Sequence, residues 1–313
     1  MIVGLFLVIL RDRNKSKETI LNPTINIIGA GNLGKTIARL IFSHNIGLIQ
    51  GICNTSIESS EKAVYFIGQG QAKKINELLP ADITFITTPD DQIESCCNKL
   101  VENSNLKEGS IILHCSGSLS SEILRITKKR GCFTASVHPM RSFAKPEISV
   151  KQYPGTYCAI EGDEKAIVAL HNIFTDIGSI LYTVNRNKKG SYHAAGVFAS
   201  NYLVTVCKNA LSCLEDAEVE KEMASKIIIN LMKSTLNNLE ATFSPEKSLT
   251  GPIQRGDINT LIKHLDSLPH PISQLYKILG LATLPIANLP KDKREKIENL
   301  FLKVNLNYCS PTL

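Results

Sequence analysis

The chain has 313 residues, of which 43% are hydrophobic and 20% are charged, and this ordinary globular composition excludes a disordered chain, a collagen, a coiled coil and a polytopic membrane protein. Lys and Arg number 35 against 29 Asp and Glu, a small excess for this length, and aromatic residues make up only 6% with no tryptophan, so a nucleic-acid partner is not expected. At roughly 150 residues per domain, the length predicts two domains.

The first ten residues, MIVGLFLVIL, are apolar and are followed by basic residues. The run is about half as long as a membrane-spanning helix, and its positive charge follows the apolar stretch, whereas a signal peptide carries it before. We interpret residues 1–22 as an extension outside the core fold or as a start codon assigned too early, with a short membrane-surface anchor as the alternative. Nine cysteines without a CxxC pair predict free thiols in a reducing cytoplasm.

Strands and helices alternate between residues 24 and 137. Apolar and β-branched runs predict strands at 24–28, 48–54, 82–87, 110–115 and 133–137, and helical periodicity predicts helices at 35–42, 61–66, 92–101 and 120–129. This alternation predicts an α/β domain with a parallel, doubly wound sheet and helices on both faces. A strand at 157–160 and a helix at 163–177 are candidates for one more pair at the domain boundary.

From about residue 190 the pattern changes to long helical segments with little strand signal. These segments lie at 192–214, 219–238, 259–268 and 272–284, and the charge run 291–296 is typical of a solvated helix face. We therefore expect a Rossmann-like domain over 23–152 and an all-α domain over 153–305.

A glycine motif follows the first predicted strand and opens the first predicted helix: Gly29-Ala30-Gly31-Asn32-Leu33-Gly34. G-x-G-x-x-G is a weak signal alone, but here it has the strand and the helix that a dinucleotide site requires. The first glycine permits the tight turn, the second lets the backbone approach a pyrophosphate, and the third lets the helix pack close to the strand. The helix N-terminus adds free N–H groups, so we expect a pyrophosphate to bind here.

The residues that follow the second predicted strand indicate whether the cofactor is NAD or NADP. An NAD site expects Asp or Glu about 20 residues beyond the glycines, where it bonds the ribose hydroxyls. Counting from Gly34 leads to Asn54-Thr55-Ser56, which has no carboxylate to repel a 2′-phosphate and can donate hydrogen bonds to one. We therefore predict NADP(H), with Thr87-Thr88-Pro89 at the next strand end lining the crevice beside the adenosine or pyrophosphate.

Two further strand ends carry polar side chains, HCSGS at 114–118 and HPMRSF at 138–143. Because the carboxyl ends of parallel strands meet at one edge of a sheet, both are expected to face the ligand crevice. His114 is equally suited to a core position with backbone partners, and His138 to a strand end without a further role. His114, Cys115 and His138 match no standard zinc spacing, and CSGS lacks the GxSxG elbow of serine hydrolases, so neither site is expected.

The helical part contributes two more clusters. His193, Val197 and Asn201 are four residues apart, which predicts one helix face. The segment LTGPIQRGD at 249–257 places Arg255 and Asp257 in a loop with Gly and Pro before a helix. Asn201 is equally suited to linking helices, and Asp257 to capping the helix that follows it.

Taken in order, GAGNLG, HCSGS, SVHPMRSF, SYHAAGVFASNYL and LTGPIQRGDINTLIKHL resemble a bacterial two-domain oxidoreductase family with an N-terminal Rossmann-like domain and a C-terminal helical domain of unknown function. The resemblance spans about residues 24–290. That family is similar to the 6-phosphogluconate dehydrogenase-like enzymes, among them pyrroline-5-carboxylate reductase, β-hydroxyacid dehydrogenases and ketopantoate reductase. The resemblance implies a C-terminal domain of that type and NADPH-dependent reduction of 2-dehydropantoate to pantoate in pantothenate and coenzyme A synthesis.

The chain departs from this pattern at the proton donor. Ordinary ketopantoate reductases carry Lys-xxx-Asn-xxx-Asn on the first interdomain helix, where this chain has His193-xxx-Val197-xxx-Asn201. The resemblance therefore implies His193 as the general acid, with Lys189 one turn earlier as the runner-up. Asn201 would hold the carbonyl oxygen or the hydroxyl.

The remaining candidates have supporting roles in this hypothesis. The guanidinium of Arg255 matches a substrate carboxylate, beside Asp257. Ser116 and His138 are candidates for orienting the nicotinamide or the substrate. We expect a small keto acid as substrate, a homodimer by analogy with the superfamily, and no membrane partner; the alternatives are an imine reductase resembling pyrroline-5-carboxylate reductase and a non-catalytic NADP-binding sensor.

Overall fold

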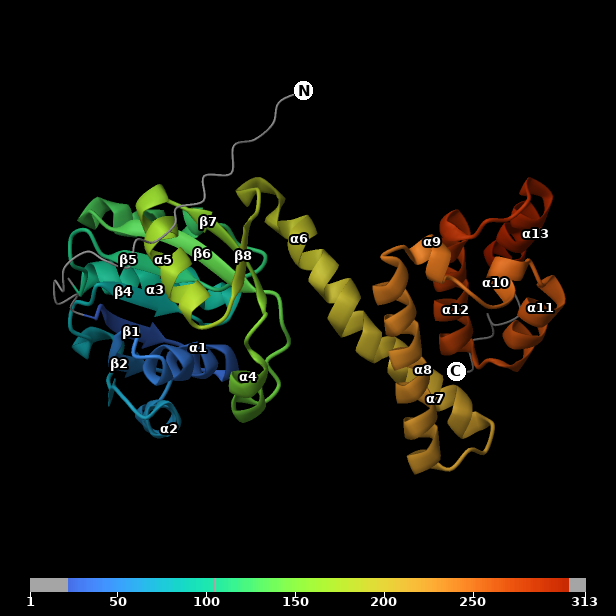
Figure 1. The fold of residues 1–313 in the computed structure, drawn as a ribbon, viewed down its shortest axis with the longest axis horizontal. Helices are drawn as coiled ribbons and strands as arrows, with labels where there is room; N and C mark the ends of the chain where they lie inside the picture. Colours follow the sequence, from blue (N-terminus) through green and yellow to red (C-terminus); the bar gives the residue numbers. More distant parts are fainter. Residues whose placement is uncertain (1–21, 104, 304–313) are drawn as a thin grey trace, which may run out of the picture. The chain divides into compact units, whose positions relative to one another are not determined.

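The computed structural model describes residues 22–103 and 105–303, so nearly all of the expected extension at 1–22 lies outside the described residues. The chain divides into two compact units, with the division between Phe198 and Ala199. Each unit is described by itself below (Figure 1).

The first unit is built on one eight-stranded sheet with the order β3-β2-β1-β4-β5-β6-β7-β8. Strands β1 to β6 run parallel, β7 is antiparallel to β6, and β8 is parallel to β7. The strands are β1 (Thr24–Ile28), β2 (Leu48–Cys53), β3 (Gln71–Ala72), β4 (Ile83–Ile86), β5 (Ile111–His114), β6 (Phe133–Pro139), β7 (Tyr157–Gly162) and β8 (Ile180–Thr183).

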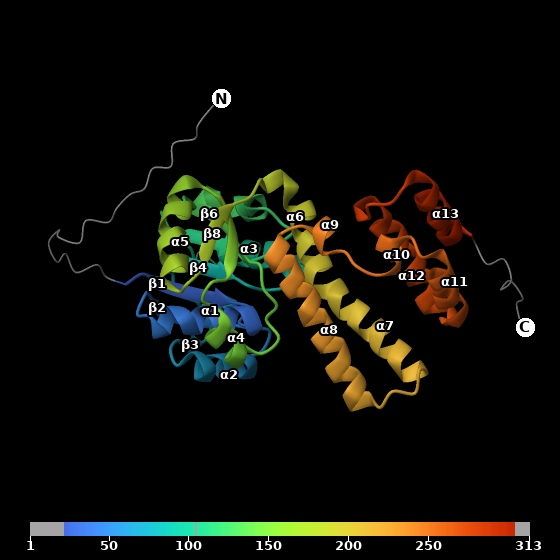
Figure 2. The same ribbon diagram turned by 45° about the vertical axis from the view of Figure 1, so that its right-hand side comes forward.

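Helices cover both faces of this sheet, as the alternation predicts. The connecting helices are α1 (Asn32–Ser43), α2 (Ile57–Ile67), η1 (Ile75–Glu77), α3 (Asp90–Glu102), the 3₁₀ helix η2 (Ser121–Arg130), α4 (Pro146–Gln152), α5 (Glu164–Asp176), η3 (Arg186–Lys188) and α6 (Lys189–Gly196). Figure 2 shows α1, α2 and α4 together on one side of the strands.

Successive residues of each strand serve two separate apolar cores. Ile27 and Phe85 pack with residues of α1, α2 and α5, whereas Ile28, Ile86 and Ile112 pack with residues of α3 and η2. Side chains alternate across a strand, so strands covered on both faces must be apolar at nearly every position. This explains why the central strands appear in the sequence as unbroken apolar runs.

The second unit is all-helical. The last segment of the first unit leads through a π-helical segment, η4 (Val197–Asn201), in which the boundary falls. The helices that follow are α7 (Tyr202–Asp216), α8 (Lys221–Thr242), α9 (Pro245–Ser248), α10 (Pro252–Arg255), α11 (Ile258–Ser267), α12 (His270–Thr283), η5 (Leu284–Ile286) and α13 (Lys291–Leu302). A small core of Leu261, Leu284, Ile297 and Phe301 holds the last of them together.

The fold class is confirmed, and the predicted boundary between the domains is not. The sequence places 153–305 in the helical domain, but β7, α5 and β8 belong to the first unit, because β7 pairs with β6 through residues such as Val137 and Ile160. Neither the exposed strand β8 nor the two-residue β3 was predicted: β3 is too short to show a pattern, and the apolar residues Ile180 and Leu181 of β8 were not interpreted as a strand. Among the described helices, none is long and apolar enough to cross a membrane.

Candidate active site

The glycine loop between β1 and α1 has the geometry that its spacing predicts. Gly29 adopts φ +86°, and a Cβ there would lie 2.6 Å from the backbone nitrogen of Thr88. A Cβ on Gly34 would lie 2.5 Å from Thr87 Oγ1 and 2.9 Å from the carbonyl oxygen of Gly29. The first and third glycines are therefore required by close packing against the end of β4.

The second glycine leaves an open helix N-terminus. A Cβ on Gly31 would meet nothing closer than the Gly29 carbonyl oxygen at 4.0 Å. Gly31 is the N-cap of α1, its first turn holds no acidic residue, and no side chain caps it. Free N–H groups and the positive end of the helix dipole therefore suit a phosphate, and the loop fits a pyrophosphate.

The other loop residues hold the loop in place. Ala30 is buried and Leu33 packs against the same core. The side chain of Asn32 donates to the carbonyl oxygens of Phe143 and Ala144, at 2.9 and 3.0 Å. The glycine loop is thereby fastened to the segment that follows β6.

The end of β2 provides donors, although two of its predicted side chains are partly engaged. Asn54 donates to the carbonyl and hydroxyl oxygens of Ser59, and Ser56 Oγ accepts from the Ser59 N–H as the N-cap of α2. Thr55 is exposed. Among these three residues, Thr55 is the one whose side chain makes no hydrogen bond within the described part of the chain.

Two lysines that the sequence reasoning missed stand beside this strand end. Strand β3 pairs with β2 through Gln71 and Ala72, and the backbone N–H of Lys73 donates to the carbonyl oxygen of Ile52 at 3.0 Å. Lys73 and Lys74 therefore follow β3 just where β2 ends. Because β3 has only two residues, no sequence pattern pointed to this placement.

The segment after β4, which the sequence predicts to line the cofactor crevice, supports the glycine loop. Thr87 Oγ1 donates to the Gly29 carbonyl oxygen at 2.8 Å, so this hydroxyl supports the glycine loop. Pro89 is the N-cap of α3, and Thr88 Oγ1 is buried without a hydrogen bond. Thr87 therefore stabilises the conformation of the glycine loop through this hydrogen bond.

His114, at the end of β5, is a buried core histidine. Its Nδ1 accepts from the Ser116 N–H at 3.1 Å, which leaves Nε2 to donate to the carbonyl oxygen of Ser120 at 3.1 Å. Burial, and then the charge of Lys189, lower the pKa of His114 to about 4. The ring is neutral at pH 7 and fixes the loop 114–120.

Ser116 is likewise engaged within this loop. Its Oγ donates to Asp90 Oδ2 at 2.8 Å and accepts from the N–H groups of Ser118 and Leu119. Ser118 Oγ donates to the same carboxylate oxygen at 2.6 Å. Asp90, the first residue of α3, therefore joins the ends of β4 and β5, a contact that the sequence analysis did not identify.

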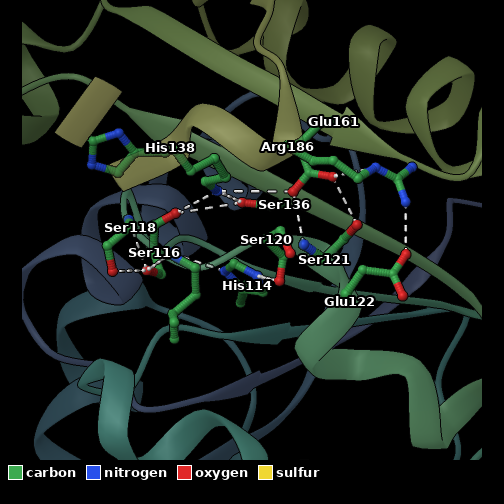
Figure 3. A network of polar contacts seen from close by, with 12 residues as sticks. His114, Ser116, Ser118, Ser120, Ser121, Glu122, Ser136, His138, Glu161 and Arg186 are labelled. Carbon is green, nitrogen blue, oxygen red and sulfur yellow. Dashed lines mark hydrogen bonds and ion pairs between the residues drawn. The ribbon is translucent and has the colours of Figure 1, made fainter. Parts of the chain in front are cut away.

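Lys189 is the centre of a buried polar network, and Figure 3 labels its partners Ser116, Ser136 and Glu161. It is 2% exposed, and its Nζ donates to the Ser116 carbonyl oxygen at 2.9 Å and to Ser136 Oγ at 2.5 Å. The Glu161 carboxylate lies 3.9 Å away and accepts from the N–H and the hydroxyl of Ser121. Burial lowers the pKa of Lys189 to about 8. Two of the three ammonium protons of Lys189 are thereby donated to oxygen atoms of the protein.

His138 and His193 meet above Gly117. A Cβ on Gly117 would lie 2.9 Å from His138 Nε2 and closer still to His193 Nδ1, so the absence of a side chain creates a notch that both rings face. The ring centroids are 5.8 Å apart. His193 Nδ1 is buried without a hydrogen-bond partner, although the residue as a whole is half-buried. Burial, and then Lys189, lower the pKa of His138 to about 4.

The other predicted catalytic residues belong to the second unit. Asn201 is exposed, and its backbone carbonyl accepts from Thr205 Oγ1. Arg255 is exposed at the end of α10. Asp257 caps α11 by accepting from the N–H and hydroxyl of Thr260, which is the alternative that the sequence left open.

Two family models match the chain. One, described as a Rossmann-like domain, matches residues 13–139, and the other, described as a domain of unknown function, DUF2520, matches residues 156–283. A search of curated proteins finds no significant match.

Solved structures share this architecture. A candidate NADP oxidoreductase from Bacteroides fragilis is 20% identical, with a TM-score of 0.69 over 83% of this chain and 97% of that one. Protein TM1727 from Thermotoga maritima is 28% identical, with a TM-score of 0.65 over 84% and 98%. A Plasmodium falciparum pyrroline carboxylate reductase with NADP bound is 13% identical, with a TM-score of 0.57 over 90% and 100%. The fold is thus that of Rossmann-type oxidoreductases with a helical C-terminal domain.

Proposed function

We propose that this chain, which joins a Rossmann-like domain to a DUF2520 domain, is an NADPH-dependent oxidoreductase that reduces a small keto acid, with 2-dehydropantoate as the first candidate. The observation that carries the proposal is the His138–His193 pair above Gly117, at the same sheet edge as an uncapped glycine loop. In open α/β sheets, ligands bind outside the carboxyl ends of the strands.

NADPH, when bound, supplies the hydride. The chain would hold its pyrophosphate at the N-terminus of α1, beside Gly31, and its 2′-phosphate near Thr55, Lys73 and Lys74. The absence of a carboxylate in Asn54–Ser56 supports NADPH over NADH. The NADP named for the Plasmodium structure is consistent with this choice.

His193 is our candidate for the general acid. Reduction of a carbonyl needs a proton on oxygen, and His193 is half-buried at the strand ends, whereas the buried Lys189 already donates to Ser116 and Ser136. Asn201 as carbonyl ligand and Arg255 as carboxylate clamp remain proposals that rest on the family resemblance.

The decisive assay follows NADPH oxidation by the purified protein with 2-dehydropantoate, with NADH as the cofactor control and pyrroline-5-carboxylate as the substrate control. Loss of general acid catalysis is typically worth 10²–10⁴-fold, so His193→Gln should lower kcat by about that factor and leave the NADPH dissociation constant unchanged. His171→Gln is the matched control, because His171 is an exposed histidine on α5, a helix that contributes no residue to the proposed site. Normal turnover in His193→Gln would remove this residue from the role.

An imine reductase is the second candidate, because the fold is shared with pyrroline carboxylate reductase. Turnover of pyrroline-5-carboxylate without turnover of 2-dehydropantoate would select it. Tight NADPH binding without turnover of either substrate would favour the sensor.

We also propose that the protein acts as a homodimer in the cytoplasm. Helices α7 and α8 carry exposed large apolar side chains, which a second copy of the chain would bury in a dimer. They are Leu203, Val204, Ile227, Leu231 and Leu236. Light scattering after size exclusion measures the mass directly, and a monomer at micromolar concentration would contradict the proposal.

A further inference from the structure

A row of aromatic rings leads from the surface of the first unit to the notch at Gly117. Tyr182 on β8 is 36% exposed, and its hydroxyl donates to the hydroxyl of Tyr192 on α6 at 3.1 Å. The Tyr192 hydroxyl in turn lies 2.9 Å from His138 Nδ1. Neighbouring ring centroids are 6.3, 5.5 and 5.8 Å apart along Tyr182, Tyr192, His138 and His193.

The donor of the Tyr182–Tyr192 hydrogen bond determines the direction of the next one. Tyr192 accepts from Tyr182, so its own proton is free to be donated to His138 Nδ1. A neutral His138 that accepts at Nδ1 carries its proton on Nε2. Nε2 is the nitrogen that faces the notch, where the buried Nδ1 of His193 has no partner. All donors therefore point from the surface toward His193.

We infer that Tyr182, Tyr192 and His138 are a proton-supply row that returns a solvent proton to His193 after each reduction. The inference rests on the proposed reductase function, because a reduction by hydride consumes one proton per turnover. The row supplies the buried side of the His193 ring, which solvent does not reach.

The transfer balances with one proton entering and one leaving. His193 releases the proton on Nε2 to the substrate oxygen and takes the His138 Nε2 proton at its own Nδ1. His138 Nδ1 takes the Tyr192 proton, Tyr192 takes the Tyr182 proton, and Tyr182 takes one from water. No member carries a net charge afterwards, and rotation of the hydroxyls and exchange of the ring tautomers restore the starting state.

The surroundings favour neutral members. Burial raises the pKa of Tyr192, and burial lowers the pKa of His138, so neither group ionises near pH 7. The link between His138 and His193 is the step that needs motion, because His193 Nδ1 has no hydrogen bond in the described structure. A small turn of the His193 ring above Gly117 closes it.

The first test needs no substrate. Long-range ¹H–¹⁵N spectra of protein with ¹⁵N-labelled histidine report which ring nitrogen carries the proton, and His138 is assigned with a His138→Gln sample. We expect His138 protonated at Nε2 in the wild type and in Tyr182→Phe, and a shift toward the other tautomer in Tyr192→Phe. A wild-type ring protonated at Nδ1 would reverse the row and overturn the inference, whether or not the protein is a reductase.

The second test uses turnover with the substrate found above. Tyr182→Phe and Tyr192→Phe should each lower kcat roughly tenfold, less than loss of the acid, because water substitutes imperfectly for a missing hydroxyl. A plot of kcat against the deuterium fraction of the solvent should be curved in the wild type, because several protons move together. The same plot should be linear in Tyr182→Phe. Tyr157→Phe is the control, since Tyr157 is 59% exposed on the neighbouring β7. An effect of Tyr192→Phe alone would reduce Tyr192 to a positioning residue and overturn the relay.

Discussion

The ammonium nitrogen of Lys189 lies 2.9 Å from the backbone carbonyl oxygen of Ser116, which ties the first turn of α6 to the end of β5. A second bond to Ser136 ties the same nitrogen to β6. Since α6 also carries Tyr192 and His193, this buried amine sets where both rings stand against the sheet. Lys189 therefore holds the start of α6 against β5 and β6.

Lys189 should make the stability depend on alkaline pH. Its pKa falls from 10.5 to about 8 on folding, so the unfolded chain binds the proton more tightly between these values. The free energy of unfolding should rise by about 3 kcal/mol from pH 8 to 10.5 through this group. Denaturant titrations should show that rise in the wild type and a smaller rise in Lys189→Met. Equal slopes in the two proteins would contradict the assigned cause.

His114 should make the stability depend on acidic pH. Its pKa falls from 6.5 to about 4 on folding, because burial, and then the nearby charge of Lys189, disfavour the protonated ring. The stabilisation is complete above pH 6.5 and is lost, by about 3 kcal/mol, as the pH falls to 4. His114→Asn should flatten this part of the curve, and His138 keeps some of the slope. The exposed His171→Asn should leave it unchanged.

The glycine loop should separate folding from cofactor binding. Gly31 has ordinary backbone angles and open space around it, so Gly31→Val should fold with little change in the melting temperature while its side chain blocks the phosphate. We expect NADPH affinity to fall at least tenfold, which is about 1.4 kcal/mol. Gly29→Val, at φ +86° and against Thr88, should instead destabilise the fold. Calorimetry and titration with NADPH measure both, and unchanged affinity in Gly31→Val would remove the pyrophosphate from this loop.

Lys73 and Lys74 should determine the preference for NADPH. Replacing both by Ala removes two charges beside the end of β2, and we expect the NADPH dissociation constant to rise about tenfold while that of NADH stays the same. Lys62→Ala is the control, because this exposed lysine on α2 is paired with Glu58. An equal loss of affinity for NADPH and NADH would show that the two lysines do not act on the 2′-phosphate.

Local patterns were sufficient for the cofactor half of the site. The turn at Gly29, the open N-terminus at Gly31 and the close packing at Gly34 follow from residues adjacent in sequence, because a strand, a loop and a helix in direct succession constrain one another. The capping alternative for Asp257 was also readable, since an N-cap acts within three residues.

The residues around Lys189 and His138 are brought together by long-range contacts that sequence spacing does not predict. Glu161 lies on β7, whose antiparallel pairing with β6 brings it beside Lys189, and that pairing also moved the boundary of the first unit past the predicted one. No sequence pattern pointed to Tyr182, and Tyr192 stood out only as a member of the SYHAAGVFASNYL segment.

The sequence by itself determined that a glycine loop opens a Rossmann-like sheet and that helices follow it, because backbone conformation and apolar periodicity are local. Only the tertiary structure decided that Lys189 is buried and engaged while His193 faces His138 across Gly117. Which of two basic side chains on one helix is buried and hydrogen-bonded depends on the strands it packs against, and those are set by pairings tens of residues apart.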